Sequence, residues 1–464
     1  MVVQHNMQAA NANRMLNITT SAQSKSTEKL SSGYRINRAA DDAAGLTISE
    51  KMRKQIKGLD RASTNAEDGV SAVQTAEGAL TEVHSMLQRM NELATQSANG
   101  TNSSTDRKAI QDEIDQLTTE IDRVSETTKF NETYLLKGDG ADKAHNVNAH
   151  DAGLDGVTLT DKGDTVDVTL KTLNAGDKVS IAGKNYTIGA TAADAQKIVK
   201  DQETNGKTVT VNGTTYTYKT NQWTNADGSA ATVGGGAAGS ITIKGGDVVS
   251  DGTKTLTAMK DGADAAGADG IDDNDSTVIT AGKAYQLQTA EIVKASSIGT
   301  DTAAAVKNGA NADKDATATF TLNKGTVSYK DALSFNLHVG ADADMTNKIT
   351  VNIDSMNSAG LGVKGIKADT EQDATYAIDA IADAISTVSS QRSSLGAVQN
   401  RLEHTINNLD NVVENTTSAE SRIRDTDMAE EMVNYSKNNI LAQAGQSMLA
   451  QANQSNQGVL SLLQ

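Results

Sequence analysis

Proline and cysteine are both absent from this chain of 464 residues, and aromatic residues make up only 3% of it. Without cysteine the chain can form no disulfide, no thiol nucleophile and no cysteine-ligated zinc site. Proline interrupts helices and central strands, so its absence fits long, unbroken helices. With one Trp and three Phe, the packing must come from Ala, Leu, Ile, Val and Met, which suits seams between helices better than the interior of a globular enzyme.

The net charge of −17 argues against nucleic acid and against an anionic membrane as partners. No apolar run approaches the length of about 18 residues that a transmembrane helix needs. The first residues, MVVQHNMQAANANRML, lack the basic and apolar regions of a cleaved signal peptide. We therefore expect a chain that stays in the cytosol or leaves the cell by a route that needs no cleaved signal.

Composition divides the chain into three zones. Residues 1–136 and 366–464 are poor in Gly and helical in their periodicity, whereas the middle is rich in Gly, Thr and Asp and alternates over short runs. No Arg occurs between Arg123 and Arg392. These changes in composition predict domain boundaries on either side of the middle zone.

An apolar repeat with alternating spacings of three and four residues runs from Leu59 to Ala94. This pattern predicts the buried seam of a long helix in a coiled coil or rod-like bundle. Shorter apolar repeats follow at Ile110–Val124 and Ile378–Val413. The large seam residues of the first helix are Leu59, Val73, Leu80, Val83, Leu87 and Met90.

The two terminal segments are only weakly amphipathic, and neither carries enough apolar surface to fold alone. We expect each to need a partner, which the other terminus can supply. Asp427 with Glu430 resembles a capping box that starts the last helix, and Asp369 with Gln372 resembles another. The apolar residues of the terminal segments are Met15, Ile18, Val433, Ile440, Leu441, Met448, Val459, Leu460, Leu462 and Leu463.

The middle zone predicts β structure. Val179–Gly189 and Val209–Lys219 are typical of hairpins closed by the dipeptides Ala-Gly and Asn-Gly, and Ile279–Thr289 shares their combination of a turn and a Tyr. Leu333–Met356 predicts a further pair of strands.

No group of residues points to catalysis. None of the six His stands in an H-E-x-x-H motif, and no G-x-S-x-G or Walker loop occurs. The acidic stretch Ala268–Thr277 lacks the spacing of a calcium-binding EF-hand and is better explained as a solvated loop. We predict that the chain is not an enzyme and has no catalytic residue, metal site or cofactor.

Several long stretches resemble bacterial flagellins. They are KLSSGYRINRAADDAAGLTIS, IKGLDRASTNAEDGVSAVQTAEGAL, LQRMNELATQSANGTNS and the ending NILAQAGQSMLAQANQSNQGVLSLLQ. The resemblance covers about the first 136 and the last 100 residues almost continuously. It departs from the family at Gln464, where a basic residue is frequent.

The resemblance implies a structural subunit that self-assembles into the bacterial flagellar filament for motility. The expected fold is mainly α with a β-rich insertion: both chain ends form a long-helix coiled coil and rod bundle, and the middle forms outer β-rich domains. Residues 1–42 and 422–464 would form the inner domain, 43–137 and 333–421 the rod with a β-hairpin near 333–363, and 138–332 the outer part. In this reading SSGYRIN is the joint between inner domain and rod, and the terminal apolar residues form the polymerisation core.

The resemblance also implies partners and a location. The chain would bind other copies of itself, the flagellar type III export apparatus, an export chaperone at the C-terminal helix, and cap and hook-junction proteins, and it would be secreted into the extracellular filament. Vertebrate Toll-like receptor 5 senses flagellin monomers, so innate immune recognition is a further expectation. The residues that match the family's receptor contacts are Arg89, Leu93 and Glu113. Since Arg89 and Leu93 lie beside the seam, we expect both to be exposed on a monomer.

Three other functions remain open at this stage. A hook–filament junction or cap-type axial protein would share weaker similarity at the two ends. An enzyme could sit in the outer domain, although the missing H-E-x-x-H argues against a metalloprotease. A free coiled-coil adhesin or scaffold would need a surface anchor, and no anchor motif is visible.

Overall fold

The helices predicted at both chain ends are present in the computed structural model, which describes residues 6–262, 268–307, 311 and 316–461. The described residues form two compact units. Unit 1 comprises Met1–Ser71, Phe335–Val351 and Ala397–Gln464, and unit 2 comprises Ala72–Ser334 and Asn352–Gly396. The long helices in these units are α1 (Met7–Ser32), α2 (Ala43–Ser97), α3 (Ser104–Thr127), α6 (Glu371–Arg424) and α7 (Met428–Ser461).

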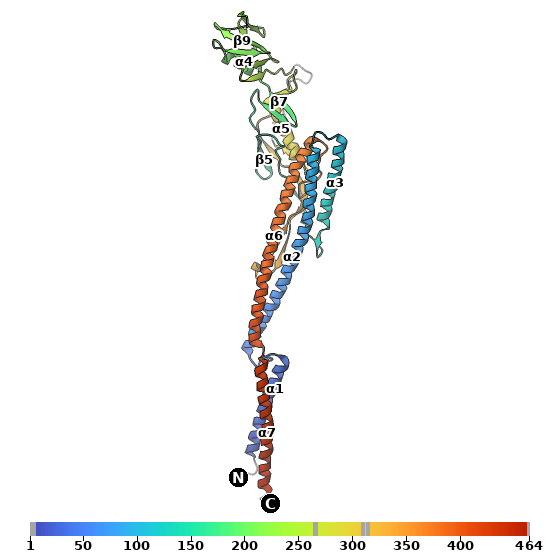
Figure 1. Ribbon diagram of the computed structural model, residues 1–464, viewed down its shortest axis with the longest axis vertical. Coiled ribbons are helices and arrows are strands. Elements are labelled where there is room, and N and C mark those ends of the chain that lie inside the picture. Colours follow the sequence, from blue (N-terminus) through green and yellow to red (C-terminus); the bar gives the residue numbers. More distant parts are fainter. Residues whose placement is uncertain (1–5, 263–267, 308–310, 312–315, 462–464) are drawn as a thin grey trace. The chain divides into compact units, whose positions relative to one another are not determined.

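In unit 2, the second part of α2, α3 and the first part of α6 lie side by side as a three-helix bundle (Figure 1). One ion pair joins each pair of helices. The N–O distances are 3.6 Å for Arg392–Glu77, 2.9 Å for Arg89–Glu113 and 3.9 Å for Arg107–Glu371. Such partly exposed pairs add little stability each, so the buried apolar stripes must supply most of it. Their largest members are Leu80, Val83, Leu87 and Met90 on α2, Ile110, Ile114 and Ile121 on α3, and Ile381 and Val388 on α6.

In unit 1, the first part of α2 and the second part of α6 pack against a β-hairpin. Its strands are β19 (Leu333–His338) and β20 (Lys348–Ile353), joined through a short 3₁₀ turn, Met345–Asn347. Ala66, Leu402 and Ile349 form a small buried cluster between the three elements. The strand pair predicted from Leu333–Met356 is therefore confirmed.

The β-rich part belongs to unit 2, and its described residues form six small sheets. Strands β3 (Asp139–Asn146) and β18 (Thr326–Asp331) pair antiparallel where the insertion begins and ends. Two further sheets have two strands each: β1 (Lys129–Phe130) with β2 (Thr133–Tyr134), and β11 (Thr232–Val233) with β12 (Ser240–Ile241). A three-stranded sheet has the order β15 (Val278–Ile279), β7 (Lys184–Ile188), β6 (Lys178–Ile181), and a four-stranded sheet has the order β16 (Ala305–Val306), β17 (Thr319–Asn323), β5 (Thr165–Thr169), β4 (Thr158–Asp161). The largest sheet has five strands in the order β10 (Gln222–Thr224), β9 (Thr214–Lys219), β8 (Thr208–Val211), β13 (Val248–Ser250), β14 (Thr255–Thr257). The short helix α4 (Ala192–Asp201) and the longer α5 (Ala281–Ala295) complete the β-rich part.

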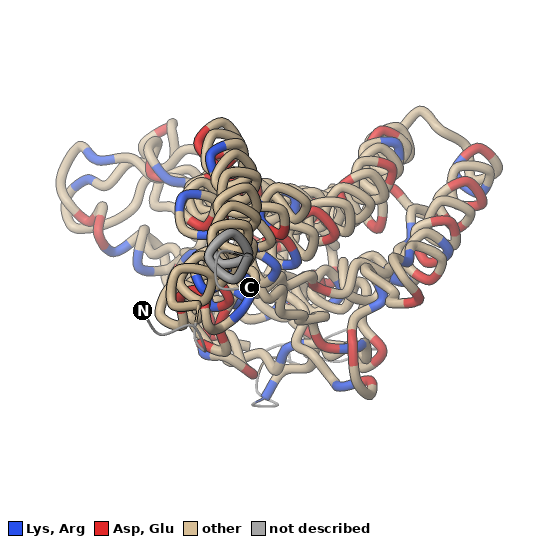
Figure 2. The backbone as a smooth tube through the Cα atoms, turned by 90° about the horizontal axis from the view of Figure 1, so that it is seen from below, with Lys and Arg blue, Asp and Glu red and all other residues tan. Residues whose placement is uncertain are grey.

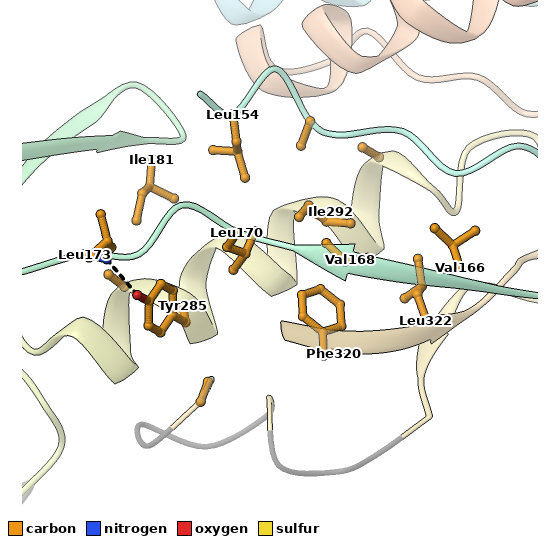
Figure 3. Packing of buried hydrophobic residues seen from close by; sticks show 14 of the residues in the cluster. Leu154, Val166, Val168, Leu170, Leu173, Ile181, Tyr285, Ile292, Phe320 and Leu322 are labelled. Atoms are coloured by element: carbon orange, nitrogen blue, oxygen red, sulfur yellow. Dashed lines mark hydrogen bonds between the residues drawn. The ribbon is translucent and has the colours of Figure 1, made fainter. Parts of the chain in front are cut away.

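Two separate cores stabilise this β-rich part. One gathers around α5, where Phe320 and Leu322 of β17 face Val168 of β5, and the Tyr285 hydroxyl accepts a 2.8 Å hydrogen bond from the backbone N–H of Leu173 (Figure 3). The other gathers around Trp223, which is 1% exposed and packs with residues of α4, β8 and β13.

Two of the three hairpin predictions are confirmed and one is wrong. β6–β7 and β8–β9 are hairpins whose turn residues, Ala182-Gly183 and Asn212-Gly213, all have positive φ, as a type I′ turn requires. Ile279–Thr289 instead begins helix α5. The Thr280 hydroxyl accepts a 3.0 Å hydrogen bond from the N–H of Lys283, so Thr280 is a helix N-cap and the residues after it form the first turn of α5.

The predicted helix starts are partly right. Asp427 caps α7, accepting from the N–H groups of Ala429 and Glu430 at 2.9 and 3.1 Å. The cap of α6 is one residue later than predicted. The Thr370 hydroxyl accepts a hydrogen bond from the N–H of Asp373 at 3.0 Å and donates one to the Asp373 carboxylate at 2.7 Å. A hydroxyl can both accept and donate, so Thr370 makes both bonds at this helix start.

Leu87 tests how far the bundle depends on its seam. Leu87→Ala should lower the free energy of unfolding by about 2–5 kcal/mol, because this fully buried side chain leaves a cavity between the helices. Urea unfolding followed by circular dichroism measures the change. The exposed neighbour Gln88→Ala is the control and should shift the value by less than about 0.5 kcal/mol. Equal shifts in the two variants would contradict the assignment of Leu87 to the core.

Candidate functional site

The terminal helices α1 and α7 run antiparallel and pack side by side within unit 1 (Figure 1). Their contact includes a polar hydrogen bond and a glycine that faces a leucine. The Asn6 side chain caps α1 by accepting from the N–H of Ala9 and donates to the carbonyl of Ala452 on α7 at 3.2 Å. A Cβ at Gly445 would lie 3.3 Å from Leu16, so glycine allows the two helices to approach closely. Ser26 is the buried residue of α1 in this contact.

The predicted apolar residues of these helices do not fill that contact but lie on its outer surface. A monomer therefore exposes large aliphatic side chains along both helices, which costs free energy in water until a partner covers them. Nothing is described of the side chains of Val459 and Leu460, and Leu462 and Leu463 lie outside the described residues. The exposed fractions are 60% for Met15, 58% for Ile18, 68% for Val433, 67% for Ile440, 47% for Leu441 and 61% for Met448.

The connectors between the helices meet at a single joint. Gly33 ends α1 in the left-handed conformation, with φ of 76°, which only glycine adopts without strain. The chain then pairs with the α6–α7 connector: the N–H of Arg35 donates to the carbonyl of Arg424 at 2.7 Å, and the N–H of Thr426 donates to the carbonyl of Gly33 at 3.0 Å. The predicted joint is thus made of two connectors from opposite ends of the chain.

Arg424 holds this joint together. Its guanidinium lies 4.9 Å from the centre of the Tyr34 ring and donates to Glu50 at 2.8 Å and to Ser49 at 3.3 Å. The hydrogen bond from Arg424 holds the pKa of the Glu50 carboxyl below its ordinary value. A lowered folded pKa adds stability above the unfolded pKa and loses it as the pH falls, so the joint is expected to loosen in acid.

Two neighbouring aspartates next to this joint have different roles at the start of α2. Asp42 caps α2, accepting from the N–H of Gly45 at 2.8 Å. Asp41 does not cap the helix but accepts from the backbone N–H groups of Asn37 and Arg38, which stabilises the connector itself.

The predicted rod seam is buried along most of its length. Val73, Leu80, Val83, Leu87 and Met90 are all fully buried, whereas Leu59 is partly exposed.

The three predicted receptor-contact residues differ in exposure. Arg89 and Glu113 are about half exposed and bond to each other, and this hydrogen bond raises the pKa of Arg89. The expectation that Leu93 is exposed is wrong, since it is 2% exposed. At this level α2 has neighbours on two sides, α3 and α6, so its buried face is wider than a single heptad seam.

The described residues contain no group of three His, Cys, Asp or Glu placed to hold a metal ion. Among them, no helix is long and apolar enough to cross a bilayer.

Comparison with known proteins decides the family. The family model of the bacterial flagellin N-terminal helical region matches residues 3–141, and that of the C-terminal helical region matches residues 378–463. Over 463 residues the chain is 40% identical to a flagellin of Clostridium tyrobutyricum, which covers 98% of this chain and all of that protein. The chain belongs to the bacterial flagellin family. It is also 35% identical to the flagellin of Bacillus subtilis (strain 168) over 465 residues, with both chains fully covered.

A solved structure of FliC from Burkholderia pseudomallei is 18% identical to the chain, with a TM-score of 0.28, over 72% of this chain and 99% of that one. Flagellins are structural proteins, so the chain is a subunit of the flagellar filament and not an enzyme.

Sequence reasoning located one half of the joint and missed the other. SSGYRIN was recognised as a break between helices, but Arg424 was not singled out. Its place directly before the capping segment Asp425–Asp427 marks a second break, and Tyr34 is an aromatic residue beside Gly33 in the first. The sequence signal for the stacking of Arg424 on Tyr34 is that one of the two residues lies at each break between helices.

Arg424→Lys tests the joint while keeping the charge. Lysine cannot lie flat on Tyr34 and bond to Ser49 and Glu50 together, so the connectors should open more often. Hydrogen exchange should become about tenfold faster at the amides of Arg35 and Thr426. Arg401→Lys, on an exposed part of the same helix, is the matched control and should leave both amides unchanged. Faster exchange in both variants, or in neither, would remove Arg424 from this role.

Proposed function

We propose that the exposed apolar faces of α1 and α7 are the surface through which copies of this chain polymerise into the filament. The exposure of six large aliphatic residues on two helices that already pair with each other carries this proposal. Covering a Val, Leu, Ile or Met side chain gains about 1.5–3 kcal/mol, so a neighbouring subunit that covers several of them supplies a strong driving force.

The observed elements support the proposed division into three parts. The inner part, 1–42 and 422–464, corresponds to α1, α7 and the joint; the rod, 43–137 and 333–421, to α2, α3, α6 and the β-hairpin; and the outer part, 138–332, begins beside β3 and ends beside β18. The pairing of β3 with β18 supports an insertion that leaves and re-enters the rod at one place.

The same exposed helices support the proposed route out of the cell. An apolar face on α7 that is uncovered before assembly fits binding by an export chaperone, followed by the flagellar type III export apparatus and secretion to the outside. Cap and hook-junction proteins would meet the chain at the growing filament through this face.

Ile18→Gln and Ile440→Gln test the polymerisation surface. Both side chains are exposed, so the monomer should keep its circular dichroism and its unfolding midpoint, while the critical concentration for filament formation rises at least about tenfold per site. Electron microscopy and sedimentation measure assembly. Asn439→Gln, next to Ile440 on α7 and polar in both forms, is the control. Removal of residues 1–30 or 440–464 should abolish filaments altogether, and normal filaments from either truncation would contradict the proposal.

We also propose recognition of the monomer by Toll-like receptor 5 through Arg89 and Glu113. Their exposed, bonded pair presents a guanidinium and a carboxylate on neighbouring helices, which supports charge-assisted contacts. Leu93 is too deeply buried to act as an apolar anchor.

Arg89→Ala should weaken binding of the monomer to the receptor ectodomain about tenfold in a titration. Arg123→Ala is matched to it, because Arg123 is also exposed and also paired with a glutamate on the rod. Unchanged binding in the Arg89 variant, or an equal loss in both, would exclude this patch.

A further inference from the structure

A row of basic side chains runs along the first part of α2. Lys51, Lys54, Lys57 and Arg61 are spaced three, three and four residues apart, so each is the surface neighbour of the next. All four are exposed, and none forms an ion pair within the part of the chain that the structure describes. Like charges at these spacings repel, so this basic stripe destabilises an isolated monomer and favours an acidic partner.

An acidic row runs along α6 in the same unit. Glu403, Asp410 and Glu414 are spaced seven and four residues apart, which places them on one face. They too are exposed. Glu403 accepts a hydrogen bond from Gln399 at 2.9 Å, but in the described structure no cation pairs with any member of this acidic stripe.

The two stripes lie on opposite flanks of the α2–α6 pair. Ala62 of α2 is buried, and at about 100° per residue Arg61 and Ser63 lie to either side of it. The Ser63 hydroxyl donates to Asp410 at 3.2 Å, so the acidic stripe lies on the flank of Ser63 and the basic stripe on that of Arg61. This explains why charges of opposite sign in one unit do not pair with each other.

Two carboxylates of α2 itself stand among the residues of the basic stripe. Glu50 is already bonded to Arg424, and Asp60, three residues after Lys57, forms no ion pair in the described structure, so four cations outnumber two carboxylates and the stripe keeps a net positive charge.

The hairpin tip approaches α2 at Gly58, where a Cβ would lie 2.9 Å from that of Ala341. The adjacent Asp342 forms no ion pair with the stripe, and Asp344 accepts from the N–H of Thr346. Figure 2 shows blue and red segments interspersed along the backbone, so the complementarity arises from helix faces and not from separate acidic and basic parts of the chain.

We propose that the basic stripe of one copy docks on the acidic stripe of the next copy. This contact rests on the proposed self-assembly and adds a lateral interface to the one made by the terminal helices. Because the stripes lie on opposite flanks, the contact is heterologous: each bound copy still offers one free stripe on its outer side. Such a contact can continue from copy to copy, as a filament requires, provided that the rotation between neighbouring copies does not close a ring.

Two charge-reversed variants test the contact. Lys51→Glu with Lys54→Glu and Lys57→Glu makes both flanks acidic, and Glu403→Lys with Glu414→Lys makes both flanks basic while keeping the Ser63–Asp410 hydrogen bond. Each variant alone should show a critical concentration at least about tenfold higher than the unmodified chain, because like charges meet. An equimolar mixture should assemble again, with the two variants alternating.

The matched control is Lys184→Glu with Lys207→Glu and Lys219→Glu, which makes the same charge change on exposed lysines of the β-rich part and should assemble normally. Circular dichroism verifies that every variant is folded. Assembly of either stripe variant alone at the unmodified concentration overturns the stripe contact and leaves polymerisation through α1 and α7 standing. A mixture that fails to assemble overturns it as well. Failure of the unmodified chain to assemble would instead overturn the proposed function.

Discussion

Much of the apolar seam of α2 is buried against α6, a helix from the opposite end of the chain. Ala66 meets Leu402 in one unit, and Glu77 bonds to Arg392 in the other, so α2 and α6 complete each other. The chain ends must therefore come together before either is stable, and everything between them becomes an insertion. Contacts this distant in sequence cost loop-closure entropy first, so we expect the bundle to form late and cooperatively.

Periodicity predicted the long helices because their apolar residues repeat at regular spacing. The dipeptides Asn212-Gly213 and Ala182-Gly183 predicted two hairpins because the turns that close such hairpins require positive φ. The same reasoning failed where one residue type serves two structures. Thr280 stands equally well in a turn or at a helix N-cap, and only the packing of Tyr285 and Ile292 in a shared core selects the helix. Leu93 shows the other limit, since a single-helix pattern does not reveal how many neighbours that helix has.

The candidate site was predicted less completely than the fold. The terminal apolar residues Met15 and Ile440 were identified from the sequence. Their exposure depends on how α1 meets α7, where Leu16 lies against Gly445 and Asn6 bonds to Ala452. The contact between the two halves of the joint escaped prediction for a similar reason. Tyr34 and Arg424 come together only after two distant connectors pair, and no local pattern encodes that contact.

The pairing of β3 with β18 has a consequence for how this chain can change over generations. Lys143 lies opposite Tyr329 and bonds to Asp331, and the His145 ring stacks on Tyr329 at 4.0 Å, so the insertion is fastened at its base. Once the two ends of a loop are fixed together, doubling its length costs only about 0.6 kcal/mol. Segments of very different size and sequence can therefore be exchanged above this base without disturbing the helices.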